Sequence, residues 1–514
     1  MEKNKQSTQI IKSTFNVIII MSIIKIFGFL KQTIIASKFG STTETDVFFI
    51  ASEFIASICV AVFSSLSVTF LSQYAQSLEL NKSIDKSYGF ASNIICIFVP
   101  VALFLMVLLI IFSGFLSKAV GPLLSNDALE LLTYYIKLLS VSIIFYGINA
   151  ILGAVLEANK VFIPSKMMGL FLSLTTIFSA LCLSETFGIF SLVIALILGY
   201  IIQFAYILMS CRKYLKFKPR KPFKDTRVKK VYKLTFPLFI GNSIYQLSLI
   251  VDKSIATFLG EGAVSALAYG QILKDFVSSV FAVAISGVLL SHFATYVAKK
   301  DFALLKKVLE KAIIIILIII IPITIFSSTQ SENIIRFIYG HGNFNENAIH
   351  NTALVLIGYS IGFCALTIRE VFVKAHYAFN DTKKPMINGA IGISINIVFS
   401  IIGAKYLGLL GISLATSISE IIVCALSYFT LKIHIESIDF TYFKNDVLKI
   451  CLSGAIVFFI NYFIHFTYKS LMLNLLLAFA EQIILYMLLL KIFRCRIFVK
   501  YYETIKRKIC KRYR

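Results

Sequence analysis

Apolar runs of about 20 residues recur along this 514-residue chain, and they limit its fold more than any other feature. Residues 99–112 and 312–326 are two examples, and neither contains a charged side chain. The chain is 58% hydrophobic with a mean hydropathy of +0.85, outside the range of soluble domains. Only helices and closed barrels satisfy their backbone polar groups in lipid. Because period-two alternation is not the pattern, the sequence predicts an all-α polytopic membrane protein.

The apolar runs predict about fourteen transmembrane helices, and short echoes indicate that twelve of them form two six-helix repeats. Residues 35–40 (Ile-Ala-Ser-Lys-Phe-Gly) return as residues 255–260 (Ile-Ala-Thr-Phe-Leu-Gly), 220 positions later. Two further echoes keep nearly this spacing, one of them at Asn159 and Asn380. A duplicated helical bundle is typical of a transporter that holds its substrate between halves. The approximate span centres are residues 24, 60, 101, 144, 172, 198, 246, 280, 318, 364, 397, 420, 458 and 482.

The duplication and the distribution of charge together predict five segments. Six spans per repeat is an even number, so both repeats enter the membrane with the same orientation. Two C-terminal helices lie outside the duplication. The segments are a first lobe of six spans (1–210), a basic cytoplasmic connector (211–233), a second lobe of six spans (234–432), two C-terminal helices (448–493) and a basic cytoplasmic tail (494–514).

Basic residues are concentrated in the connector and near the C-terminal end. Residues 211–233 hold eleven Lys and Arg side chains, and residues 491–514 hold ten. Because short cytoplasmic loops carry an excess of basic residues, this asymmetry places both termini in the cytoplasm. Topology and contact with anionic membrane lipids explain the net charge of +24, so we expect no nucleic-acid partner.

The cysteines and the known nucleotide motifs predict no cofactor. The nine cysteines are scattered without the spacing of a metal site, so neither a metal centre nor a disulfide framework is expected. No Walker motif is present, which argues against ATP as the direct energy source. The membrane potential supplies about 2.3 kcal/mol per charge per 100 mV and is a sufficient driving force. Coupling to Na⁺ or H⁺ stays open.

Ionisable residues within the first two apolar runs need a reason, because each costs about 2.5–3.5 kcal/mol on insertion. Lys25 lies near the centre of the first span, and Lys31 follows about 120° further around the helix. Asp46 and Glu53 share a face at the start of the second span. These side chains either reach the membrane interface or line a water-filled cavity. In a cavity, the lysines would suit an anionic headgroup such as a diphosphate.

The second repeat carries intramembrane charges of its own. Asp252, Lys274 and Arg369 fall in spans seven, eight and ten, and each has an oppositely charged neighbour in the sequence. Structural pairing with neighbouring helices and a role in the same cavity both stay open. The candidate substrate-binding residues are Lys25, Lys31, Asp46, Glu53, Lys274 and Arg369, and the candidate cation-binding residue is Asp252.

The first seventy residues and one later loop carry the most specific motifs. Residues 27–31 read Phe-Gly-Phe-Leu-Lys, residues 36–40 Ala-Ser-Lys-Phe-Gly, and residues 45–49 Thr-Asp-Val-Phe-Phe. Residues 380–385 read Asn-Asp-Thr-Lys-Lys-Pro. With weaker matches between them, these segments resemble the MurJ/MviN family of lipid II flippases. That family belongs to the multidrug/oligosaccharidyl-lipid/polysaccharide exporter superfamily, and the resemblance covers nearly the whole chain.

The resemblance implies a flippase that moves an undecaprenyl-diphosphate-linked sugar across the bacterial cytoplasmic membrane by alternating access. Lys25 and Lys31 stand where the family has basic residues that handle the lipid diphosphate. Asp46 matches an acidic position at the start of span two, and Asp252 matches one tied to cation binding in some members. The resemblance also implies that the polyprenyl tail lies along spans thirteen and fourteen.

The chain departs from the family pattern at two positions. Cys59 replaces an arginine in span two, and Ile272 replaces another in span eight. The remaining lysines offer point charges rather than the bidentate fork of arginine. The substrate therefore stays open between lipid II, the peptidoglycan precursor, and another lipid-linked oligosaccharide destined for capsule, O-antigen or exopolysaccharide.

Two other classes of protein fit the sequence less well. A cation-coupled drug antiporter would favour a net acidic cavity, which the lysines argue against. A membrane enzyme such as a polyprenyl-linked glycosyltransferase would need a sizeable outer loop with catalytic groups. The outer loops are short, and His341 and His350 have no evident catalytic partner. We therefore expect a transporter and not an enzyme.

Overall fold

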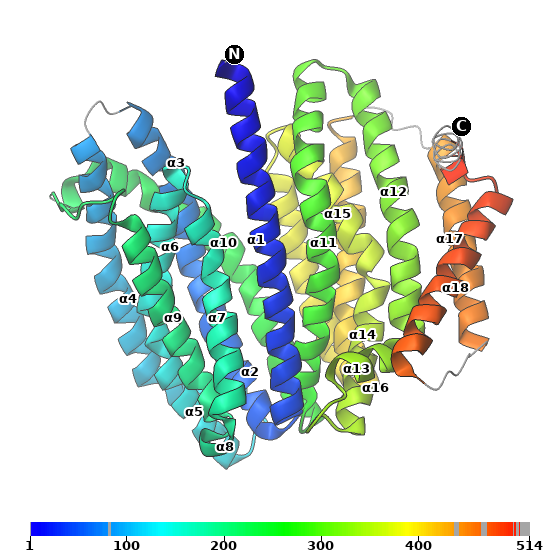
Figure 1. Ribbon diagram of the computed structural model, residues 1–514, viewed down its shortest axis with the longest axis horizontal. Coiled ribbons are helices and arrows are strands. Elements are labelled where there is room, and N and C mark those ends of the chain that lie inside the picture. The colour runs from blue at the N-terminus through cyan, green and yellow to red at the C-terminus, as the bar shows by residue number, and fades with distance from the viewer. Residues whose placement is uncertain are drawn as a thin grey trace. The chain divides into compact units, whose positions relative to one another are not determined.

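The computed structural model confirms the all-α prediction (Figure 1). Within the part of the chain that it describes, all regular structure is helical. The chain divides into two compact units, Met1–Ser265 with His341–Asn345, and Ala266–Gly340 with Glu346–Arg514. The lobe and connector boundaries given by the sequence stay predictions. The residues described are 2–80, 84–220, 222–435, 441–463, 470–496, 498, 499 and 503.

In the first unit, α1 packs on α7 and α7 on α9, while α10 packs on α2, α3 and α4. The segments α2, η1 and α3 follow one another without a break, and η1 is a π-helical turn. The elements are α1 (Glu2–Phe39), α2 (Thr43–Cys59), η1 (Val60–Ser64), α3 (Ser65–Leu80), α4 (Ile84–Val120), α5 (Asn126–Ser140), α6 (Ser142–Ala158), α7 (Ile163–Cys182), α8 (Ser184–Phe187), α9 (Phe190–Cys211), η2 (Pro222–Lys224), α10 (Thr226–Ala256) and η3 (Thr257–Leu259).

In the second unit, α16 packs on α14 and α15, and α12 packs on α15, α17 and α18. Buried Gln482 of α18 donates from Nε2 to the carbonyl oxygen of Pro322 in α12 at 2.5 Å, which joins these helices by a polar contact. The elements are α11 (Ala263–Ala298, which begins in the first unit), α12 (Phe302–Thr329), α13 (Ser331–Tyr339), α14 (Glu346–Ile361), α15 (Phe363–Ala378), α16 (Lys383–Lys432), α17 (Thr441–Phe463) and α18 (Leu471–Ile492).

Eleven of the described helical segments are long and apolar enough to cross a membrane, and α14 with α15 makes a twelfth, bent by 43°. The sequence predicts about fourteen spans, and two features account for the difference. Gly408 interrupts α16 with non-helical backbone, so this 50-residue element contains two of the predicted spans. The span predicted around residue 280 falls on α11, where residues 280–288 lie outside the side chains that the structure describes.

The backbone repeats an uncommon conformation at three pairs of positions that are each 220 residues apart. All six residues have positive φ, the region that glycine adopts most readily. At Gly188 and Gly408 the ψ angles also match, at −143° and −135°. This backbone periodicity agrees with the duplication and its spacing. The pairs are Gly40 and Gly260, Lys160 and Asn380, and Gly188 and Gly408.

The helices on either side of Gly188 and of Gly408 cross at equivalent points. A Cβ atom added to Gly199 of α9 would lie 2.8 Å from Leu172 of α7. In α16, Gly392 takes the position 220 residues after Leu172, and its carbonyl accepts a hydrogen bond from Ser419 Oγ at 2.7 Å. Each crossing therefore has one glycine. In the first repeat it lies on the second helix of the pair (Gly199), and in the second repeat on the first helix (Gly392). Small residues at such crossings allow close helix packing in membranes.

Replacing Gly408 by alanine should destabilise the second unit. Its φ of 59° with ψ of −135° lies in a region that is essentially restricted to glycine, and forcing another residue there costs about 1–3 kcal/mol. A Cβ atom at Gly408 meets no neighbour within 4 Å, so the effect would come from the backbone alone. Thermal unfolding in detergent measures it. Gly389→Ala, in the same element with equally open space, is the control and should not lower stability. Equal shifts for both variants would contradict this account.

Candidate functional site

Helix α1 carries the two lysines predicted to bind substrate. It ends at Phe39, and the next residue, Gly40, has a φ of +66° and donates its N–H to the carbonyl of Ala36 at 2.8 Å. Lys25 is exposed and Lys31 half-buried. Among the residues described, no carboxylate forms an ion pair with either lysine. Next to Lys31, the buried Oε1 of Gln32 has no hydrogen-bond partner in the same set.

Asp46 joins two turns of the first unit. It lies in the first turn of α2, after the N-cap Thr42, and is 2% exposed. Its Oδ1 accepts the Ser265 N–H and its Oδ2 accepts the Gly262 N–H, both at 2.7 Å. Each carboxylate oxygen therefore takes a backbone hydrogen bond from the turn that begins α11. Since Gly262 follows Gly260 as Thr42 follows Gly40, Asp46 connects equivalent turns of the two predicted repeats.

Glu53 pairs with a lysine of α10. The Lys253 ammonium lies 2.9 Å from Glu53 Oε2, with side chains 6% and 25% exposed. The same ammonium lies 5.9 Å from the centre of the Phe49 ring. Asp252, the candidate cation ligand, is also buried on α10. The structure thus pairs the predicted residue Glu53 of span two with Lys253 of span seven, and the two charges neutralise each other.

The predicted site residues of the second unit also have neighbours there. The Lys274 ammonium lies 4.8 Å from the centre of the Tyr359 ring, a cation–π distance. Arg369 of α15 lies 3.1 Å from Glu420 of α16 and 3.4 Å from Glu370. Arg369 therefore has the structural pairing that the sequence left open. Its nearer partner is Glu420 of α16 rather than Glu370, its neighbour in the sequence.

The two positions at which the resemblance implies an arginine differ in their surroundings. Cys59 is 1% exposed and lies at the end of α2, where the π-helical η1 begins. Such single π-turns are frequent at functional sites. Ile272 of α11 is half-buried. Neither side chain can supply a cation, so the basic groups of the candidate site are the lysines and Arg369.

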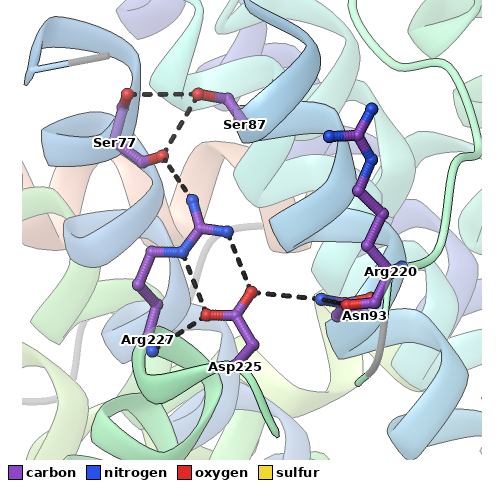
Figure 2. A network of polar contacts seen from close by, with 6 residues as sticks. All are labelled: Ser77, Ser87, Asn93, Arg220, Asp225 and Arg227. Atoms are coloured by element: carbon purple, nitrogen blue, oxygen red, sulfur yellow. Dashed lines mark hydrogen bonds and ion pairs between the residues drawn. The ribbon is translucent and has the colours of Figure 1, made fainter. Parts of the chain in front are cut away.

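A polar network holds the basic connector against α3 and α4 of the first unit (Figure 2). Asp225 caps α10 and accepts hydrogen bonds from Arg227 and Asn93, at 2.8 Å and 3.1 Å to its Oδ2. Arg227 continues to Ser77 at 3.4 Å and lies over the Phe90 ring. Burial by itself would raise the pKa of Asp225, but the hydrogen bonds and charge of Arg227 outweigh it and hold the pKa below its usual value. Arg227 is thus a structural member of an otherwise exposed basic segment.

Replacing Asp225 by asparagine should make the protein less stable at neutral pH and less sensitive to acid. Because the folded pKa is depressed, the ionised carboxylate stabilises the fold above its ordinary pKa of about 3.9. That contribution is lost as pH falls through the lower folded value. Unfolding temperatures between about pH 3 and pH 6 test this. Asp301→Asn, at the N-cap of α12, is the control, and an unchanged acid limb in Asp225→Asn would contradict the assignment.

Sequence reasoning located the intramembrane charges but missed most of their partners. Lys253 stands 200 positions from Glu53, and Glu420 stands 51 positions from Arg369. One signal was available, since a charge in an apolar span requires an opposite charge or a polar ligand nearby. That signal names no particular partner, because several acidic residues lie in other spans.

The two helical units, whose described segments include eleven that are long and apolar enough to cross a membrane, define a multi-pass membrane protein. Residues 35–477 match the family described as lipid II flippase MurJ. The chain therefore belongs to the lipid II flippase MurJ family, which confirms the resemblance found in the sequence. This membership makes it a transporter rather than an enzyme.

Individual relatives agree with this assignment. A probable lipid II flippase MurJ of Buchnera aphidicola is 27% identical over 464 residues, covering 88% of this chain and 90% of that protein. The one from Vibrio cholerae is 26% identical over 469 residues, covering 88% of each. A solved lipid II flippase MurJ in an inward closed conformation matches with a TM-score of 0.80 and 28% identity, over 96% of this chain and 100% of that one.

The fold also extends to more distant transporters. An inward-facing multidrug resistance transporter of the MATE family, in the MOP superfamily, matches with a TM-score of 0.68 and 14% identity. The match covers 83% of this chain and 99% of that one. This likeness concerns the fold alone.

Proposed function

We propose that this chain is a flippase that moves lipid II across the bacterial cytoplasmic membrane by alternating access. Family membership over residues 35–477 and the fold shared with a solved lipid II flippase support the proposal. Lipid II joins a sugar headgroup to a polyprenyl tail through a diphosphate. The protein therefore has to accommodate a negatively charged group within the membrane while the tail stays in an apolar environment.

The observation that carries the proposal is the contrast between paired and unpaired charges. Glu53, Lys253 and Arg369 have opposite charges within 3.1 Å, whereas Lys25 and Lys31 have no such partner among the residues described. An unpaired ammonium within an apolar helix is costly, so it is retained where a ligand supplies the opposite charge. A diphosphate does so, and lysine binds phosphate through charge-assisted hydrogen bonds.

An apolar cavity in the second unit suits part of the polyprenyl tail. It has a volume of about 500 Å³ and lies between α12, α15, α16 and α17. Ile313, Phe372 and Tyr428 are among its lining residues, and α17 is the first of the two C-terminal helices. We assign the tail to this cavity and to the adjoining surface of α17 and α18. The headgroup, by contrast, is assigned to the lysines of α1.

The basic connector supports the proposed orientation in the membrane. Most of its Lys and Arg side chains are exposed, as expected for residues that set topology and contact anionic lipid headgroups. We place the connector and both termini in the cytoplasm. Membrane potential then favours outward movement of negative charge. Asp252, buried on α10, remains our candidate for cation coupling.

Two residues support an alternative substrate of the same chemical class as lipid II. Cys59 and Ile272 replace arginines of the family pattern, which removes bidentate donors that would read a particular headgroup. Another undecaprenyl-diphosphate oligosaccharide would still present the diphosphate to Lys25 and Lys31. This alternative changes the sugar and keeps the mechanism.

Complementation separates the two substrates. We expect the chain to restore growth and cell shape to a bacterial strain depleted of its lipid II flippase. A strain lacking a capsule-oligosaccharide flippase should not be rescued. Rescue of the capsule strain alone, with protein detected in the membranes of both strains, would replace lipid II by the other oligosaccharide. Rescue of neither strain under that condition would contradict the flippase proposal.

A further inference from the structure

Two histidines and one aspartate meet at one end of the second unit. His376 lies in the last turn of α15, Asp381 in the turn that leads to α16, and His434 just beyond the end of α16. Nδ1 of His376, Oδ2 of Asp381 and Nε2 of His434 all lie within 4.8 Å of one another. The three groups are brought together by the fold, since His434 follows Asp381 by 53 positions.

The turn between α15 and α16 positions the aspartate. Asn380 has a φ of +58°, which lets the chain reverse, and the Asp381 N–H donates to the carbonyl of His376 at 3.0 Å. The Lys384 N–H then donates to Asp381 Oδ1 at 3.2 Å. This hydrogen bond fixes the carboxylate and leaves Oδ2 directed at the two imidazoles. The ring of His434 is held by stacking on Phe379, with 4.9 Å between centroids.

His376 is fully buried, and its two ring nitrogens face different groups. Nε2 lies 3.2 Å from the carbonyl oxygen of Ser427, which can only accept a hydrogen bond. Nε2 therefore carries the hydrogen, and in the neutral ring Nδ1 holds a lone pair. Among the residues that the structure describes, buried Nδ1 has no hydrogen-bond partner, and it lies 3.4 Å from Asp381 Oδ2. Asp381 Oδ2 has His434 Nε2 at 2.7 Å, so the lone pair of His376 Nδ1 is the group left for a cation that the three residues would share.

We propose that His376, Asp381 and His434 form a binding site for a divalent transition-metal ion, with Zn²⁺ as the best match. Two imidazoles and one carboxylate, with a water in the fourth position, are a common zinc ligand set. Ligand bonds of about 2.0–2.2 Å at tetrahedral angles place neighbouring ligand atoms roughly 3.4 Å apart. The His376–Asp381 separation already has this value. His434 Nε2 lies 2.7 Å from Asp381 Oδ2 and would have to move outward by roughly 0.7 Å to reach it.

The surroundings of the histidines supply the outer contacts that such sites use. Thr430 Oγ1 lies 3.1 Å from His376 Nε2 and 3.0 Å from Asn388 Nδ2. A hydrogen bond to the non-ligating nitrogen fixes the tautomer and the ring orientation in metal sites. His434 is partly exposed, so an ion can reach the cluster from solvent.

One group opposes metal binding. The Lys384 ammonium lies 3.7 Å from Asp381 Oδ2 and acts as a competing cation. Its side chain is partly exposed and can leave the carboxylate when a divalent ion arrives. Removing this lysine should therefore strengthen binding rather than weaken it. The bound ion would connect α15, the following turn and the far end of α16, which stabilises this end of the unit.

Titration of the purified full-length protein with Zn²⁺, and with Co²⁺ as a spectroscopic probe, tests the site. We expect one ion per chain, a Co²⁺ spectrum of tetrahedral type and a higher unfolding temperature with Zn²⁺. His434→Ala should lower the affinity at least about 100-fold, and Thr430→Val about 10- to 100-fold. Lys384→Ala should raise it. His350→Ala, at an exposed histidine paired with Glu332, is the control and should leave binding unchanged.

His434 is chosen because its side chain is partly exposed and its removal costs little packing, and the unfolding transition without metal checks that the variant is folded. Binding that is equally strong in His434→Ala and the parent would place the ion elsewhere and overturn the proposal. Absence of Zn²⁺ binding in the folded parent would overturn it as well, and a proton shared by the cluster would then satisfy His376. These outcomes are independent of lipid transport and so of the proposed flippase function.

Discussion

Replacing Lys31 or Lys25 by alanine should lower the rate of lipid II flipping roughly 10- to 100-fold in proteoliposomes. Each lysine is assigned a charge-assisted contact with the diphosphate, and such hydrogen bonds contribute about 1.5–3 kcal/mol. A difference of 1.4 kcal/mol corresponds to a factor of ten. The double variant should be inactive, whereas Lys31→Arg should keep most of the activity because it keeps the charge. Fluorescent lipid-linked sugars, quenched from one side of the bilayer, provide the measurement.

The control is Lys118→Ala, an exposed lysine in the last turn of α4 of the same unit. It removes the same charge at a position outside the candidate site and should leave flipping unchanged. Stability should not fall in the α1 variants, because Lys25 and Lys31 have no ion-pair partner among the described residues that would be left uncompensated. Parent-like flipping by the double variant would show that the headgroup is bound elsewhere.

Replacing Glu53 by alanine should destabilise the first unit by about 2–4 kcal/mol. The variant leaves the Lys253 ammonium, 6% exposed, without its carboxylate at 2.9 Å. Breaking a buried pair by removal of one partner costs about 3–5 kcal/mol, and the partial exposure of Glu53 places this pair toward the lower end. Unfolding by heat in detergent, or by denaturant where it is reversible, gives the size of the effect.

A double-mutant cycle isolates the pair itself. Glu53→Ala combined with Lys253→Met removes both charges, closes the cycle with the two single variants, and should recover most of the lost stability. The control is Glu79→Ala. Glu79 is exposed and lies in α3, which continues α2 after the η1 turn, so its loss should change stability little. If Glu53→Ala and Glu79→Ala have the same stability, or the double variant is no better than Glu53→Ala, the pair does not stabilise the fold.

The class of fold follows from hydropathy and charge alone, because lipid leaves few alternatives to a bundle of apolar helices. The sequence also indicates the duplication, although the short echoes at residues 35–40 and 255–260 are weak. In the structure the repeat is clearer in the backbone than in the side chains. The positive-φ turns at Gly188 and Gly408 repeat in backbone geometry, while the residues at the neighbouring crossings, Leu172 with Gly199 and Gly392 with Ser419, exchange sizes.

The candidate site is only partly readable from the sequence. Charge in an apolar run identifies Lys25, Lys31 and Glu53 as unusual, but it does not distinguish a paired residue from an unpaired one. Asp46 illustrates the limit, because its carboxylate binds backbone N–H groups of Gly262 and Ser265, which no side-chain pattern reveals. Partners more than 50 positions away become visible only when the helices are packed.

The central claim is that Lys25 and Lys31 recognise the diphosphate of the lipid, and a comparison of two ligands tests it most directly. Purified parent protein and the Lys25→Ala/Lys31→Ala variant are each titrated with undecaprenyl diphosphate and with undecaprenol, which has the same tail without phosphate. We expect the parent to prefer the diphosphate at least about tenfold and the variant to bind both ligands equally. A variant that keeps the full preference of the parent would contradict the claim.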